Sequence, residues 1–115
     1  MNNCQLQIES YKMNTEKATI IVEGSFAEGY EEYFEEYSVT IRNYLAKYRA
    51  VVIRRQLVSE VLYGQNSPNL FMVIDFDDKI LAKKIFFEEA YLSVIPLSDK
   101  IFKTFNMYLA DVGNV

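Results

Sequence analysis

The sequence predicts an α+β fold in which one antiparallel sheet carries its helices on a single face. The most apolar run of the chain, Asn69–Phe76, lies between Pro68 and two aspartates, as expected of a buried central strand. Between about Gly29 and Tyr48, aromatic and aliphatic residues recur at three- and four-residue spacing, which is typical of a helix. Short β-rich runs precede and follow these two segments, so strands and helices share the chain.

The elements are expected in the following order. Residues 1–16 form an N-terminal arm or an edge strand, and 17–115 form a single domain. Within that domain we expect a strand at Lys17–Glu23, a helix at about Gly29–Tyr48, a long or bent strand at Ala50–Tyr63, the central strand Asn69–Phe76, a helix capped by Asp77, a short helix near Glu89–Ile95 that reaches about Ile101 after a kink at Pro96, and a last strand at Thr104–Ala110.

This order, β-α-β-β-α-β, is the split βαβ arrangement of ferredoxin-like folds. Both crossovers have the same hand, which places both helices on one face of the sheet. The central strand is nevertheless apolar on two sides, with Leu70, Met72 and Ile74 on one face and Phe71 and Val73 on the other. A bare face of this kind would exceed the roughly few hundred Å² of apolar patch that monomers usually expose. We therefore expect a two-fold symmetric homodimer that pairs sheet to sheet through the open face.

Composition excludes several classes of function. The 115 residues contain no His and one Cys, which excludes the common zinc sites, a histidine-ligated haem and a Ser-His-Asp triad, so we expect no metal and no cofactor. A net charge of −4 argues against nucleic-acid binding, even though Phe71 and Phe76 superficially resemble base-stacking residues. No apolar run has membrane-spanning length and no secretory signal is evident, so we expect a cytoplasmic protein without a membrane partner.

Local strings between about Lys17 and Asp111 match the pattern of a known family. The matching pieces are Gly29-Tyr30-Glu31-Glu32-Tyr33, Glu60-Val61-Leu62-Tyr63-Gly64, Val73-Ile74-Asp75-Phe76, Ala82, Tyr91 and Pro96-Leu97. Together they resemble the family called domain of unknown function thirteen-thirty, within the dimeric α+β barrel superfamily. The chain departs from the family with Arg49-Ala50 in place of a glycine pair, Ile85 in place of a Trp and Ser98 in place of an Arg.

The resemblance implies the same fold but does not select a reaction. Its superfamily includes cofactor-independent monooxygenases, small-molecule isomerases, haem enzymes and plain ligand-binding modules, and one fold supports many functions. Residues that match the family pattern, or that lie at strand ends, are the candidates for a site. They are Arg55, Glu60, Asp75 and Tyr91.

Asp75 and Glu60 are the candidate catalytic residues, and Arg55 and Tyr91 are the candidate ligand-binding residues. Asp75 would lie within the barrel, where its carboxylate either pairs with Arg54 or Arg55 or acquires a raised pKa suited to a general acid or base. The competing interpretation is a structural Arg–carboxylate pair at the dimer interface, with Tyr91 as a core aromatic.

We expect a dimeric module that binds a small, partly apolar ligand, because the sequence contains no triad, metal set or phosphate loop. The alternative is a cofactor-independent monooxygenase or isomerase acting on an aromatic or lactone-like small molecule. A raised pKa of Asp75 or Glu60 beside a water-excluding cavity would favour the alternative.

Overall fold

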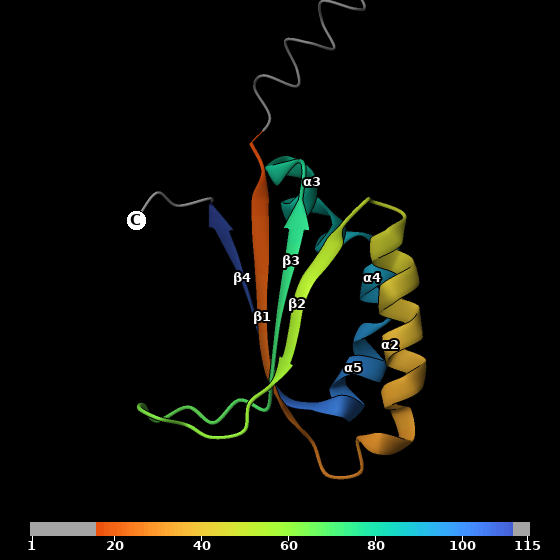
Figure 1. Ribbon diagram of the computed structural model, residues 1–115. Helices are drawn as coiled ribbons and strands as arrows, with labels where there is room; N and C mark the ends of the chain where they lie inside the picture. Colours follow the sequence, from red (N-terminus) through yellow and green to blue (C-terminus); the bar gives the residue numbers. More distant parts are fainter. Residues whose placement is uncertain (1–15, 112–115) are drawn as a thin grey trace, which may run out of the picture.

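The structure, a computed structural model, describes residues 16–111, which form a four-stranded sheet with helices on one face (Figure 1). The elements are β1 (Ala18–Phe26), α2 (Glu31–Ala46), β2 (Val51–Leu57), β3 (Leu70–Phe76), α3 (Lys79–Lys84), the 3₁₀ turn η1 (Ile85–Phe87), α4 (Glu89–Leu92), α5 (Ile95–Ile101) and β4 (Phe102–Asp111). The strands lie in the order β2-β3-β1-β4, and each neighbouring pair is antiparallel. The predicted order of strands and helices is confirmed.

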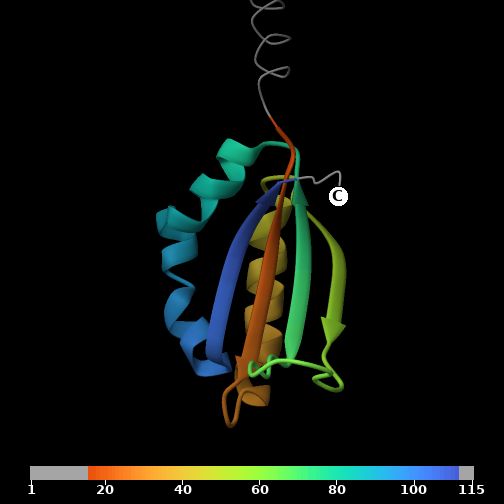
Figure 2. The same ribbon diagram turned by 90° about the vertical axis from the view of Figure 1, so that its left-hand side faces the viewer.

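The register places alternate residues of the strands on opposite faces. Ile20 of β1 lies opposite Ile74 of β3, and both are buried against the helices. Ile21 lies opposite Val73, and both face the other way and are half-buried. Viewed from that side, the sheet has no helix in front of it (Figure 2). Apolar residues of β1 and β3 therefore lie on both faces of the sheet, and helices cover one of these faces.

The core lies between the sheet and the helices. Tyr37, Tyr44 and Leu45 of α2 are buried in it, which confirms the aromatic stripe as the inward face of this helix. From the other crossover, Ala82 and Ile85 are fully buried. The Tyr44 hydroxyl donates a hydrogen bond to the Ile85 carbonyl and so joins α2 to η1.

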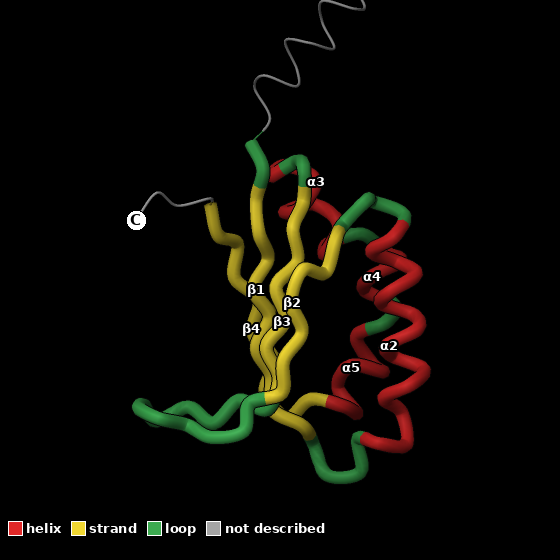
Figure 3. Tube along the Cα trace, viewed as in Figure 1, coloured by secondary structure: helices red, strands yellow, loops and turns green. Residues whose placement is uncertain are grey.

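The predicted strand Ala50–Tyr63 is too long, because β2 ends at Leu57 and residues 58–69 form a loop (Figure 3). The last β2–β3 pair is Leu57 with Leu70, and Val58 then donates its backbone N–H to the Asn69 carbonyl at 2.8 Å. Pro68 precedes β3 and has no backbone N–H that could donate a hydrogen bond between strands. Residues 58–63 therefore have a composition typical of a strand but no neighbouring strand to pair with.

The predicted N-cap of α3, Asp77, is wrong by one residue. Asp78 is the N-cap, and its Oδ1 accepts from the backbone N–H groups of Ile80 at 2.9 Å and Leu81 at 3.3 Å. Pro96 does not kink a continuous helix but lies in the first turn of α5, where its missing N–H costs little. The second crossover is thus a chain of short helices.

Two further predictions concern the N-terminal residues and the membrane. The proposed arm or edge strand at residues 1–16 lies, except for Glu16, outside the described residues. Among residues 16–111, no helix combines the length and apolar character needed to cross a membrane.

Candidate functional site

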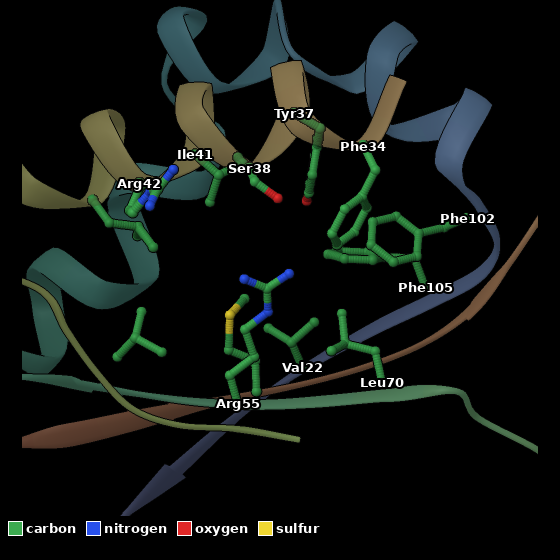
Figure 4. A pocket seen from close by; sticks show the side chains of 13 residues that line it. Val22, Phe34, Tyr37, Ser38, Ile41, Arg42, Arg55, Leu70, Phe102 and Phe105 are labelled. Carbon is green, nitrogen blue, oxygen red and sulfur yellow. The ribbon is translucent and has the colours of Figure 1, made fainter. Parts of the chain in front are cut away.

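A cavity of about 160 Å³ lies between α2 and the sheet (Figure 4). Most of its walls are apolar, and they include Val22 of β1, Leu70 and Met72 of β3, and Phe34 and Ile41 of α2. An apolar cavity of about 150 Å³ is large enough to accept a molecule such as benzene. The space therefore suits a ligand whose apolar part is one ring or a short chain.

Four polar residues line this apolar space, three from α2 and one from β2. They are Tyr37, Ser38, Arg42 and Arg55. In Figure 4 the hydroxyl groups of Tyr37 and Ser38 point from the helix toward the sheet, and the Arg55 guanidinium rises from the sheet toward them. A few convergent polar groups in an otherwise apolar cavity are the usual composition of a small-molecule site.

A β-bulge decides which arginine of β2 reaches the cavity. Val52 lies opposite Ile74, and the next pair joins Arg54 to Val73, so that Ile53 is the extra residue. Strict alternation from Val52 would turn Arg54 toward the helices. With the bulge, Arg54 shares the open face with Val73, and Arg55 shares the helix-covered face with Met72.

Arg55 contacts an aromatic ring at the edge of the cavity. Its guanidinium carbon lies 5.3 Å from the centre of the Phe34 ring, a distance at which the cation is attracted by the ring face. The ion pairs within residues 16–111 join Lys79 to Asp111 at 2.7 Å and to Glu16 at 3.7 Å, and they involve neither Arg42 nor Arg55. Within the described part of the chain, the two cavity arginines thus lack a carboxylate partner.

Tyr37 is the one phenol on the cavity wall within residues 16–111. Burial raises its pKa, the nearby Tyr91 adds to this effect, and a hydrogen bond with Ser98 partly opposes it. The hydroxyl therefore stays protonated at neutral pH. It can exchange hydrogen bonds with a ligand, but it is a poor general base.

The structure separates the four site residues predicted from the sequence. Arg55 alone lines the cavity. Asp75 is exposed on the open face, where its Oδ1 accepts from the Thr19 hydroxyl at 2.9 Å, and among the described residues it forms no ion pair with an arginine. Glu60 is exposed in the loop 58–69. Tyr91 is buried in the core, with its ring centre 5.0 Å from that of Phe86.

Sequence reasoning missed the contribution of α2 to the cavity. Ser38 follows Tyr37 and precedes Ile41, so it interrupts the apolar stripe with a small hydroxyl. Arg42, four residues further on, lies on the same side of the helix. A short polar residue and a cation within an otherwise apolar helix face were the available signals.

Comparisons with known proteins give structural neighbours alone. No family model matches the chain, and no curated protein does. A protein of unknown function from Rhodopseudomonas palustris is similar with a TM-score of 0.73 and 6% identity, over 99% of this chain and 97% of that one. A dimeric protein of unknown function and ferredoxin-like fold from Bacteroides fragilis has a TM-score of 0.58 and 11% identity, over 84% and 96%.

The fold is ferredoxin-like. A further neighbour with the same architecture is SnoaB, a cofactor-independent oxygenase from Streptomyces nogalater, with a TM-score of 0.60 and 13% identity over 87% of this chain and 96% of that one. At identities this low, the structural similarity establishes the α+β fold alone, and the chemistry has to be argued from the cavity.

Proposed function

We propose that this protein binds a small, partly apolar molecule in the cavity between α2 and the sheet. The observation that carries the proposal is that Tyr37, Ser38 and Arg55 point into an apolar space of about 160 Å³ that Arg42 also lines. Apolar walls stabilise the ligand by removing its surface from water, and the polar groups fix its orientation.

Binding without turnover is favoured over catalysis by the titratable groups that line the cavity. Within the described residues these are Tyr37, Arg42 and Arg55, and none of them is a base at neutral pH. The carboxylates of Asp75 and Glu60 lie outside the cavity wall. A cofactor-independent monooxygenase or isomerase remains the alternative, supported by the shared fold with SnoaB.

Native mass spectrometry of freshly purified protein tests the binding proposal. A protein that carries extra mass, released on denaturation, is the expected result, and the released compound can then be identified. The oxygenase alternative predicts instead that an aromatic substrate is consumed only when oxygen is present. A protein that binds neither a retained compound nor any member of a small-molecule library would contradict the proposed function.

We also propose that two copies pair through the open face of the sheet, as a dimeric α+β barrel protein of the domain of unknown function thirteen-thirty type. The open face carries Ile21, Phe71 and Val73, each half-buried within one copy. The loop 58–69 extends beyond the same face, and its Leu62 and Tyr63 are 89% and 99% exposed (Figure 1). The dimeric neighbour from Bacteroides fragilis supports this arrangement.

We further propose that the protein is located in the cytoplasm.

A further inference from the structure

We propose that the ligand of the cavity is a monocarboxylate with one aromatic ring or a short apolar chain. This inference rests on the proposed function and specifies the chemical class of the ligand. Two arginines line the cavity, Arg42 on α2 and Arg55 on β2, and in Figure 4 the Arg55 guanidinium points into the space while Arg42 lies beside α2 at its margin. Guanidinium groups remain charged at all physiological pH values and bind carboxylates in a bidentate manner.

The direction of Arg55 is set by the fold before any ligand arrives. The bulge at Ile53 directs Arg55 inward, and the Phe34 ring lies 5.3 Å from its guanidinium carbon. Because Arg42 and Arg55 form no ion pair within residues 16–111, a ligand carboxylate would not have to displace a carboxylate of that part of the chain. Pre-positioned donors reduce the entropic cost of binding.

The surroundings also limit the ligand to one negative charge near Arg55. A second, more open hollow shares Phe34 and Arg55 with the cavity and is lined by Glu31 and Glu35. These carboxylates would repel an anion on the outer side of Arg55. The ligand carboxylate is therefore assigned to the inner side, between Arg55 and Arg42, with the Ser38 hydroxyl as an additional donor. The apolar part of the ligand then lies against Val22 and Phe102.

The test uses phenylacetate as the probe and phenylacetamide as its neutral control, titrated into the full chain and followed by NMR of the backbone amides. We expect phenylacetate to bind at least about tenfold more tightly, since a hydrogen bond to a charged group contributes more than one to a neutral group. Arg55→Gln should reduce this preference severalfold, because only Arg42 then remains as a cationic partner. Arg54→Gln is the matched control, because it removes the same charge from the adjacent residue on the opposite face, and it should retain the preference.

Each other outcome has a defined meaning. Equal affinities for phenylacetate and phenylacetamide would overturn the carboxylate inference and leave the proposed function intact. Equal losses in Arg54→Gln and Arg55→Gln, or shifts confined to the open face, would place anion binding elsewhere and also overturn it. If neither compound binds at millimolar concentration, both the inference and the proposed binding of a small aromatic ligand in this cavity are wrong.

Discussion

Filling the cavity with a side chain is the most direct test that the space exists and is the site. Val22 is 2% exposed, lies on β1 and lines the cavity floor. Val22→Phe adds about four carbon atoms, which at ~0.8 kcal/mol per buried methylene would contribute roughly 3 kcal/mol if they enter the cavity without strain. Overpacking of a core typically costs about 1–3 kcal/mol. We therefore expect a free energy of unfolding equal to that of the unmodified protein or up to about 2 kcal/mol higher.

Ile20→Phe is the matched control for this substitution. Ile20 is 5% exposed, lies two residues earlier on the same face of β1 and packs in the core away from the cavity wall. Because the new ring has no space to fill there, we expect a loss of about 1–3 kcal/mol. Urea unfolding of both variants, with the slope m compared between them, gives the two free energies.

The same pair of variants tests ligand binding. Val22→Phe should remove binding of phenylacetate while the protein remains folded, whereas Ile20→Phe should retain it. A Val22→Phe variant that is destabilised as much as Ile20→Phe would refute the reasoning, since the cavity would then offer no room for the ring. Full binding by a stable Val22→Phe variant would show that the ligand lies elsewhere.

Three further predictions concern assembly, pH and backbone strain. Val73→Arg, which puts a charge on the open face, should convert a dimer to a monomer or an aggregate, as measured by size-exclusion chromatography with light scattering. Leu92→Arg on the helical side is the control and should leave the dimer unchanged. An unchanged Val73→Arg dimer would exclude the open face as the contact. Burial raises the pKa of Tyr37, Tyr44 and Tyr91, so above about pH 10 the unfolded chain loses phenolic protons that the folded chain retains, and the free energy of unfolding should fall as pH rises. Tyr37→Phe should reduce that slope in urea titrations at successive pH values, and an unaltered slope would contradict the assignment. Arg49 has a φ of 57°, in the left-handed region that costs residues with a side chain roughly 1–2 kcal/mol relative to glycine. Arg49→Gly should therefore leave the free energy of unfolding, measured by urea denaturation, equal or raise it by up to about 1 kcal/mol. A clear loss would mean that contacts of the Arg49 side chain contribute more to stability than its backbone conformation costs.

The order of elements could be predicted from the sequence because each element has its own local pattern. Asn69–Phe76 is apolar enough to be central, and the spacing within α2 is helical whatever surrounds it. The end of β2 could not be predicted, because residues 58–63 have the composition of a strand and lack a partner to pair with. Strand length is decided by the neighbouring strand, which local composition does not report.

The candidate site was predicted less well than the fold, and the reason lies in the same strand. Arg55 was one of the predicted candidates and lines the cavity, but the bulge at Ile53 that turns it toward the helices depends on pairing with β3. Asp75 was placed correctly on the open face, yet in a single copy that face is exposed, so the predicted burial of its carboxylate would need a second copy. The glycine that the family resemblance places near Arg49 does coincide with a left-handed backbone position.

Because of the bulge in β2, two adjacent residues of this strand face two different proposed binding surfaces. Arg54 faces the side on which a second copy is proposed to dock, and Arg55, its immediate neighbour, faces the ligand cavity. Any shift of this edge strand on pairing would move the Arg55 guanidinium, which is proposed to bind the ligand. Thermodynamic linkage requires the effect to be reciprocal, so a ligand that tightens the pair must itself bind more tightly to the paired form. Occupancy of the cavity would then depend on protein concentration, and this small domain would respond to its own abundance as well as to its ligand.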